Sequence, residues 1–152
     1  METKLNGMAR ALGAAGLLPM LAVLAVLAGD FSTESRDAAL SIGHGYAALI
    51  LSFLGGLWWG LAARPQPAAV PGWIWIAAVA PSLVAFFPMV GMALGLWGAV
   101  PALTMTGGGL LLALLVDRKL VALGLAPVWW MRLRVPLSLG LGGMSLIAAG
   151  LA

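Results

Sequence analysis

The sequence predicts an all-α integral membrane protein with five transmembrane helices. Of its 152 residues, 62% are hydrophobic and only 9% are charged, whereas a soluble domain carries roughly 25% charged residues. The apolar residues gather in five runs, each near the roughly 20 residues that a helix needs to cross a hydrocarbon core. Backbone polar groups in lipid must pair within their own segment, so these runs are helices rather than isolated strands. We expect one five-helix domain over residues 1–152.

The predicted helices follow one another with short connections. The first covers residues 11–28; Lys4 and Arg10 before it resemble a secretory signal, but we interpret the run as a membrane helix. The second, 40–63, follows an acidic connection, and the third, 73–90, follows a proline-rich turn. The fourth, 92–116, comes after a short uncharged hairpin at Pro88 and Gly91, so it lies antiparallel to the third. The fifth covers residues 135–151.

The segment 117–134, between the last two helices, is predicted to lie flat on the headgroups. It mixes basic residues, leucines and paired tryptophans, a composition typical of interfacial segments. Gly124 and Pro127 argue against one unbroken helix. Its basic residues favour anionic lipid of the inner leaflet. The residues that we expect at the inner interface, in contact with lipid, are Arg64, Arg118, Lys119, Trp129, Trp130, Arg132 and Arg134.

The distribution of lysine and arginine predicts the orientation. With the N-terminus inside, the inner segments hold seven of the eight basic residues and the outer segments hold only Arg36. Inner loops of membrane proteins carry such an excess. We therefore expect the N-terminus in the cytoplasm, the C-terminus outside, and a location in the bacterial inner membrane.

Composition also excludes several kinds of chemistry. The chain has no cysteine, which excludes thiolate chemistry and cysteine-ligated metal centres. The five predicted spans contain no lysine, aspartate or glutamate, so neither a retinal Schiff base nor an intramembrane pair of catalytic carboxylates can form. The basic residues lie at helix ends rather than on one soluble face, which argues against nucleic acid. We expect no catalytic residues, no enzymatic activity, no metal site and no cofactor.

His44 is the one residue that titrates near neutral pH, and it lies about one turn into the second predicted helix. It is a candidate ligand-binding residue, as is the neighbouring Tyr46, although either can be merely structural. Pro81 and Pro101 predict kinks in the third and fourth helices. Kinked helices can enclose a small pocket, and the candidate lining residues are Phe86, Phe87 and Trp97.

Small residues predict where helices pack closely, because small residues four apart let membrane helices approach. Gly56 and Gly60 form such a pair on the second helix, and Gly91 and Gly95 repeat the spacing at the start of the fourth. The predicted packing residues are Ser52, Gly55, Gly56, Gly60, Gly91 and Gly95.

Two stretches resemble a known family. Tyr46–Gly60, "YAALILSFLGGLWWG", resembles the signature of small multi-pass membrane proteins that form a domain of unknown function, found in proteobacteria and in a mitochondrial relative called transmembrane protein 69. The matching residues are Tyr46, Leu51, Ser52, Phe53, Leu54, Gly55, Gly56, Trp59 and Gly60, whereas Ala47 stands where the family has glycine. The later "WWMRLRVPLSL" is also similar to the family pattern, at Trp129, Leu133, Arg134 and Leu137. The resemblance implies a five-helix inner-membrane protein and no particular activity.

The sequence leaves two main functions open. The first is a non-enzymatic accessory or scaffold protein that packs through glycine faces, either in a homo-oligomer or in a larger membrane complex such as a respiratory or photosynthetic assembly. The alternative is a protein that binds or transports a small molecule or lipid in a pocket between the kinked third and fourth helices. An interface enzyme that uses Arg64, Arg132 and Arg134 on anionic headgroups is a third reading, for which no nucleophile or metal set is present.

Overall fold

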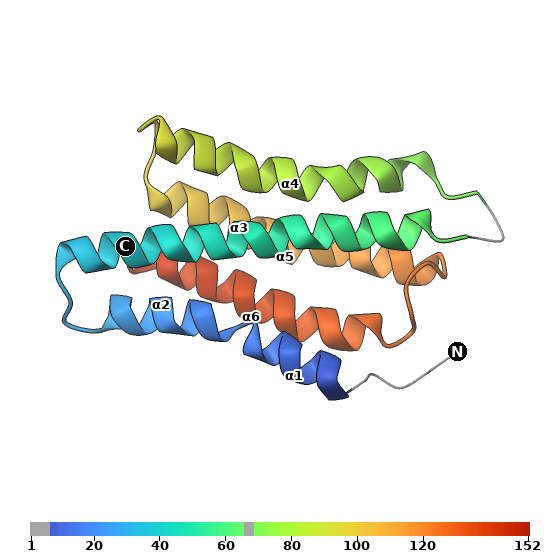
Figure 1. The fold of residues 1–152 in the computed structure, drawn as a ribbon, viewed down its shortest axis with the longest axis horizontal. Coiled ribbons are helices and arrows are strands. Elements are labelled where there is room, and N and C mark those ends of the chain that lie inside the picture. Colours follow the sequence, from blue (N-terminus) through green and yellow to red (C-terminus); the bar gives the residue numbers. More distant parts are fainter. Residues whose placement is uncertain (1–6, 66–68) are drawn as a thin grey trace.

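The computed structural model describes residues 7–65 and 69–152. Lys4, one of the basic residues assigned to the inner side, lies outside them, as does the middle of the proline-rich turn. The described helices are α1 (Gly7–Ala15), α2 (Leu18–Ala28), α3 (Thr33–Ala63), α4 (Gly72–Ala93), α5 (Ala99–Ala122) and α6 (Trp130–Gly150) (Figure 1). Counting α1 and α2 as one span, five helical stretches are long and apolar enough to cross a membrane. The predicted five-helix, all-α architecture is confirmed.

The first predicted helix is broken in two. α1 ends at Ala15 and α2 begins at Leu18, with Pro19 in its first turn. Proline has no N–H, so it cannot donate to the carbonyl of the preceding turn. At the break, the Tyr46 hydroxyl of α3 donates to the carbonyl of Gly16. The interruption thus obtains a polar partner from another helix.

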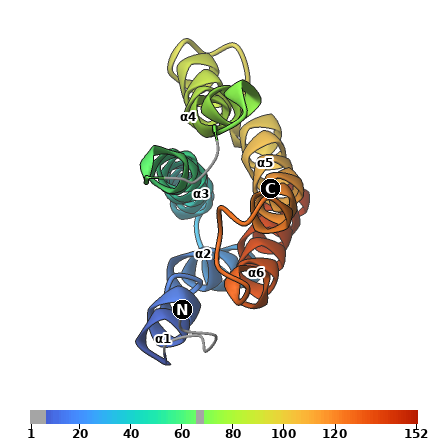
Figure 2. The ribbon, with the colours of Figure 1, turned by 90° about the vertical axis from the view of Figure 1, so that its right-hand side faces the viewer.

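α3 begins seven residues before its predicted start, because its N-terminal cap lies outside the apolar run. The Ser32 side chain accepts a hydrogen bond from the Ser35 backbone N–H at 3.3 Å, and Glu34 occupies the first turn, where a negative charge suits the helix dipole. With 31 residues, α3 is about 46 Å long, well beyond a hydrocarbon core of about 30 Å. It contacts α2, α4, α5 and α6, and it lies between α4 and α2 in Figure 2, facing α5 and α6.

The connection between α4 and α5 differs from the predicted hairpin at Pro88 and Gly91. Pro88 lies inside α4, which continues to Ala93, and α5 begins at Ala99 instead of 92. The turn comes at Gly95, whose φ of +68° suits glycine. The Leu96 N–H donates to the Gly91 carbonyl at 2.8 Å, the pattern in which a left-handed glycine closes a helix.

The predicted interfacial segment is much shorter than expected. α5 extends to Ala122 and α6 begins at Trp130, so only residues 123–129 connect them. Gly124, with a φ of +71°, ends α5, and the Leu125 N–H donates back to the Leu120 carbonyl at 2.9 Å. Asp117 is therefore part of α5, and the prediction that the spans hold no acidic residue is wrong.

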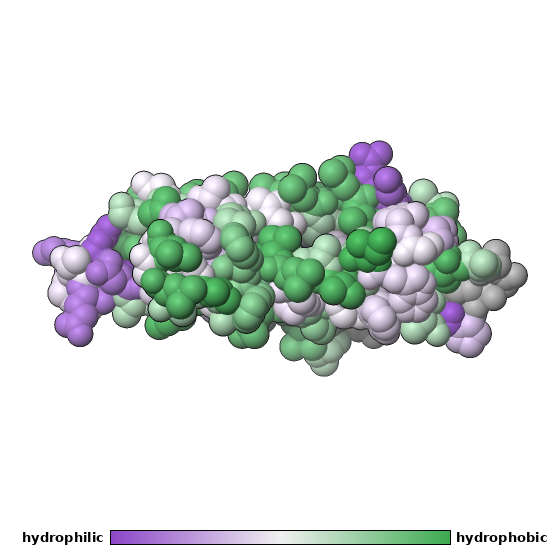
Figure 3. Space-filling view, turned by 90° about the horizontal axis from the view of Figure 1, so that it is seen from above, coloured by the Kyte–Doolittle hydropathy of each residue, from purple (hydrophilic) through white to green (hydrophobic). Residues whose placement is uncertain are grey.

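The helices form an open bundle with an apolar belt. α5 and α6 lie side by side, and Gly107 and Gly142 face each other there, each 3.0 Å from the carbonyl oxygen of the other when a Cβ is placed on it (Figure 2). Hydrophobic residues cover the middle of the surface in Figure 3, and the strongly hydrophilic residues gather toward its two ends. This distribution is that of a chain with its long axis across a bilayer.

Candidate functional site

Asp117 is the centre of the most polar cluster in the described part of the chain. It is fully buried within α5. Its Oδ1 accepts from the indole N–H of Trp58 at 2.9 Å and from that of Trp130 at 2.8 Å, while Oδ2 accepts from Arg134 Nε at 2.9 Å. A carboxylate only accepts hydrogen bonds, and three N–H donors from α3 and α6 suit this form. The cluster joins three helices at one point.

Arg134 completes the cluster and forms the one salt bridge among the described residues. The residue is 6% exposed. Its Nε binds Asp117, and one terminal nitrogen, Nη2, donates to the Ser138 hydroxyl one turn further along α6 at 2.9 Å. The fork geometry of a guanidinium allows both interactions together. No described residue pairs with the other terminal nitrogen, Nη1, and Nη1 is not among the fully enclosed unpaired atoms.

Such a cluster is costly at membrane depth. Removing two charges from water carries a desolvation penalty that only good geometry and further hydrogen bonds offset. Ionisable residues inside membrane segments are therefore rare, and they commonly mark a functional site. Here both carboxylate oxygens of Asp117 accept hydrogen bonds, whereas Nη1 of Arg134 has no partner among the described residues.

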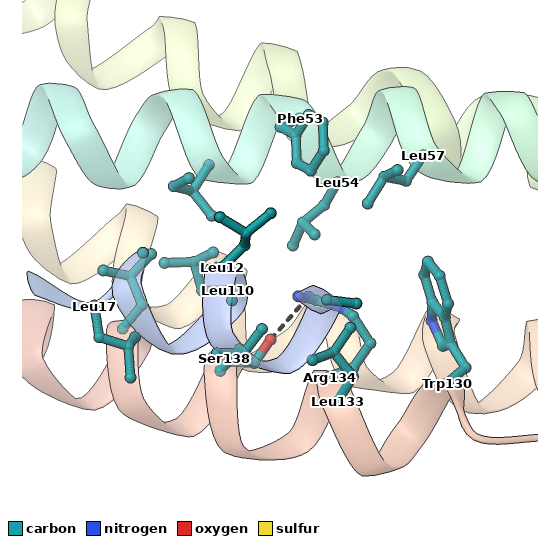
Figure 4. Close-up of a pocket in the computed structure, with 16 residues that line it drawn as sticks. Leu12, Leu17, Phe53, Leu54, Leu57, Leu110, Trp130, Leu133, Arg134 and Ser138 are labelled. Atoms are coloured by element: carbon teal, nitrogen blue, oxygen red, sulfur yellow. Dashed lines mark hydrogen bonds between the residues drawn. The ribbon is translucent and has the colours of Figure 1, made fainter. Parts of the chain in front are cut away.

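A cavity of about 400 Å³ opens beside this cluster, between α1, α3, α5 and α6. Figure 4 shows Arg134 reaching into it, with its hydrogen bond to Ser138, opposite Leu54 and Leu57 of α3. Arg134 is the only charged side chain among the described lining residues, which are otherwise almost all apolar. They are Ala9, Leu12, Gly13, Gly16, Leu17, Ile50, Phe53, Leu54, Leu57, Leu110, Trp130, Leu133, Arg134, Leu137, Ser138 and Leu141. We refer to this space as the Arg134 cavity.

A second cavity, of about 500 Å³, lies between α3, α4 and α5. It lies between the helices where a pocket was expected, and Pro81 and Gly108–Gly109 line it. Pro101, which was expected to kink the fourth helix, lies in the first turn of α5. The aromatic residues that were expected to line the pocket do not line this cavity. Phe86 and Phe87 are exposed on the outside of α4. Trp97 packs on Phe87, with ring centroids 5.2 Å apart, and donates to the Pro88 carbonyl at 3.2 Å. These aromatic residues stabilise the turn.

Neither His44 nor Tyr46 is among the residues that line these two cavities. His44 is buried, and its ring lies next to the Ala102 carbonyl of α5, although neither nitrogen meets a described partner in hydrogen-bonding geometry. The Tyr46 hydroxyl donates a hydrogen bond to the Gly16 carbonyl. No group of three or more potential metal ligands exists among the described residues, so His44 has no companions for a metal site of that kind. The two residues stay ligand candidates from the sequence alone.

The residues expected at the inner interface divide into two groups. Trp130 and Arg134 were expected to contact lipid, but both are buried, because their side chains donate hydrogen bonds to the carboxylate of Asp117. Arg64 donates to the Leu125 carbonyl at 2.7 Å and fastens the connection between α5 and α6. The remaining residues, Arg118, Lys119, Trp129 and Arg132, are exposed or half-buried, and the Lys119 ammonium lies 5.3 Å from the ring centroid of Trp73.

Only some of the predicted packing residues lie at contacts between helices. Gly55 lets α3 and α4 touch, because a Cβ placed there would overlap the Ala78 carbonyl oxygen. Ser52 supports this contact by a hydrogen bond of 2.9 Å to Ser82. Gly56 and Gly60 instead face outward, with no described atom within 4 Å of an added Cβ. Gly91 accommodates the Trp97 ring and Gly95 ends α4, so these two form no helix–helix face.

The Asp117 cluster was not predicted, because the fourth predicted helix ended at residue 116. One signal for it was present. Trp58 and Trp130 belong to tryptophan pairs at the ends of two different helices, and an indole that is buried needs an acceptor for its N–H. Asp117 was the only acidic residue in the second half of the chain.

Comparison with known proteins gives a family but no activity. No curated protein and no solved structure matches the chain. One family model matches residues 5–150, nearly the whole chain, under the description of a protein of unknown function, DUF3429. The resemblance to an uncharacterised multi-pass membrane family is thereby confirmed, and the chain belongs to the DUF3429 family of proteins of unknown function.

Proposed function

We propose that this protein binds an amphipathic small molecule or lipid of the membrane in the Arg134 cavity. A single observation carries the proposal: a buried arginine lines an otherwise almost entirely apolar cavity of about 400 Å³ and has one terminal nitrogen without a partner among the described residues. Ligand sites are commonly apolar pockets of this size with a few polar groups that orient the ligand. The apolar part of the ligand would lie against the leucines of α1, α3 and α6.

Native mass spectrometry of the full chain, released from its own membrane in a lipid-preserving medium, tests this proposal. The wild type is expected to carry a reproducible extra mass of small-molecule size. Leu57→Trp should abolish it, because Leu57 lines the cavity and the larger side chain fills it. Leu49→Trp is the matched control on the same helix, since Leu49 is exposed and lines neither large cavity. An adduct that persists in Leu57→Trp, or a wild type without one, contradicts the proposal.

The accessory or scaffold function is a second candidate, favoured by the outward face of α3. Gly56 and Gly60 leave open space there, one turn apart, beside the buried Gly55. Small residues that face away from their own bundle allow another helix to approach closely. Such a helix would come from a second copy or from a larger membrane complex, in which this chain is an accessory subunit.

Oligomeric mass separates this candidate from the first. Replacing Gly56 and Gly60 together by leucine should convert any assembly into single copies, because the added side chains cover the open face. Gly143→Leu is the control, since Gly143 on α6 also has open space around it. Assembly that survives the double substitution, or a single-copy wild type, would exclude this face as the interface.

We further propose the bacterial inner membrane as the location, with the N-terminus in the cytoplasm. The excess of basic residues on the side of Arg64, Arg118, Lys119 and Arg132 supports this orientation. Arg118 and Lys119 are exposed, where they would meet anionic lipid of the inner leaflet.

A further inference from the structure

We infer that the Arg134 cavity takes an uncharged molecule with a hydrogen-bond-accepting oxygen, such as a carbonyl, in preference to an anion such as a fatty-acid carboxylate. This inference rests on the proposed ligand binding and names the chemical class of the ligand. A lone arginine in an apolar cavity would ordinarily indicate an anionic ligand. The structure points the other way, because the positive charge of Arg134 already has its counter-charge.

The first step is the charge of the site. Asp117 and Arg134 meet at 2.9 Å, and the carboxylate is fully buried. Two indole N–H groups hold the carboxylate in addition. The ion pair therefore contributes a net charge of zero to the site. No other charged side chain among the described residues lines the cavity.

The second step is the cost of adding a charge. An anion at the free terminal nitrogen of Arg134 would share the guanidinium with Asp117, and the site would then hold one uncompensated negative charge among leucines. Uncompensated charges are strongly disfavoured in such surroundings. A neutral carbonyl accepts the same hydrogen bond and adds no charge. Since ion pairing would otherwise favour the anion, the preference for the neutral molecule is a direct consequence of Asp117.

Two further arginines lie near the cavity but do not change this balance. Arg10 of α1 and Arg132 of α6 line a separate notch of about 230 Å³, on which Leu133 and Leu137 also border. Both arginines are exposed. Water, salt and lipid headgroups therefore screen their charges, which a buried ligand would feel far less than that of Asp117.

A fatty acid and its methyl ester test the inference, because they share one chain and differ in charge. Binding of radiolabelled palmitate and methyl palmitate to the full chain in mild detergent would be measured by scintillation proximity, at a pH well above that at which the acid ionises. Only the part of the signal that Leu57→Trp abolishes is counted as cavity binding. We expect the ester to bind at least about tenfold more tightly than the carboxylate in the wild type.

Two variants show whether Asp117 sets this preference. Asp117→Asn leaves Arg134 without a counter-charge, so palmitate should gain at least about tenfold relative to the ester. The double variant Asp117→Asn with Arg134→Gln restores a net charge of zero, and palmitate should lose that gain. The wild-type comparison needs no substitution, so the inference can be tested even if a variant fails to fold.

The outcomes separate the inference from the proposed function. If palmitate binds the wild-type cavity as tightly as its ester or more tightly, the inference is overturned, while ligand binding stands. If neither probe gives a signal that Leu57→Trp removes, and no native adduct is found in the mass spectrum, the proposed function itself fails.

Discussion

Asp117 joins three helices through a single side chain. Trp58 of α3 and Trp130 and Arg134 of α6 all donate to it at 2.8 to 2.9 Å. Its complete burial makes the stability of the fold depend on which charges of the pair are removed. Removing one member of a buried ion pair leaves the other charge uncompensated, whereas replacing both charges together costs far less.

Asp117→Ala is therefore expected to lower the free energy of unfolding by about 3–5 kcal/mol, because Arg134 would remain buried without a counter-charge. Thermal unfolding in detergent, followed by circular dichroism, measures the loss. The double variant Asp117→Asn with Arg134→Gln is the control, since the asparagine oxygen can still accept from both indoles. If the single and double variants unfold alike, the charge pairing contributes little to the fold.

The helix α3 combines two kinds of glycine in adjacent positions. Gly55 sits where α3 touches the Ala78 backbone of α4, and Gly56 sits on the outward face with open space around it. Both belong to the same stretch of small residues, and only the spatial arrangement of the helices distinguishes them. The pair therefore offers a matched comparison one residue apart.

Gly55→Ala should destabilise the protein by about 1–3 kcal/mol, because the added methyl group meets the Ala78 carbonyl and pushes α3 and α4 apart. Gly56→Ala should be neutral or stabilising by up to about 1 kcal/mol, because alanine favours a helix more than glycine does. Denaturant unfolding of the two variants in the same detergent provides the measurement. Equal stability of the two variants would show that the contact between α3 and α4 tolerates the extra volume.

At the level of the helices, the sequence predicted how many membrane-spanning helices the chain forms better than it predicted the residues at which they begin and end. Hydropathy alone predicts five spans, because burying backbone in lipid leaves few alternatives to a long apolar helix. The observed helix ends differ from the predicted ones for two reasons. A capping residue can lie outside the apolar run, as Ser32 does, and a glycine can end a helix beyond the apolar run, as Gly95 and Gly124 do. The candidate site was not predicted, because Asp117 and its partners are distant in sequence and meet only through helix packing.

Across the whole molecule, charged residues concentrate toward the two ends of the bundle, and the Asp117–Arg134 pair differs from the others in being buried. Arg118 and Lys119 are exposed at the end of α5, whereas Asp30, Glu34 and Asp37 are exposed around the start of α3. The positive-inside rule predicts that the first end faces the cytoplasm.

Cysteine labelling checks this orientation directly, because the natural chain has no cysteine. A cysteine in place of Arg118 is expected to react with a membrane-impermeant maleimide only after the inner side is opened. A cysteine in place of Glu34 should react in intact cells. Both positions are exposed, so reactivity reports the side of the membrane. The reverse pattern would place the N-terminus outside.

For the ligand binding proposed above, the break between α1 and α2 suggests a route into the Arg134 cavity. α1 forms part of the cavity wall through Ala9, Leu12 and Gly13, yet none of its residues is buried. It packs against α6 at Gly13, where an added Cβ would lie 2.8 Å from a Leu137 methyl group. Because no residue of this nine-residue helix is buried, we expect α1 to be the part of the wall that moves to admit a ligand from the surrounding lipid. Exchange would then run sideways through the bilayer, and occupancy would follow the mole fraction of the ligand among the lipids rather than its concentration in water.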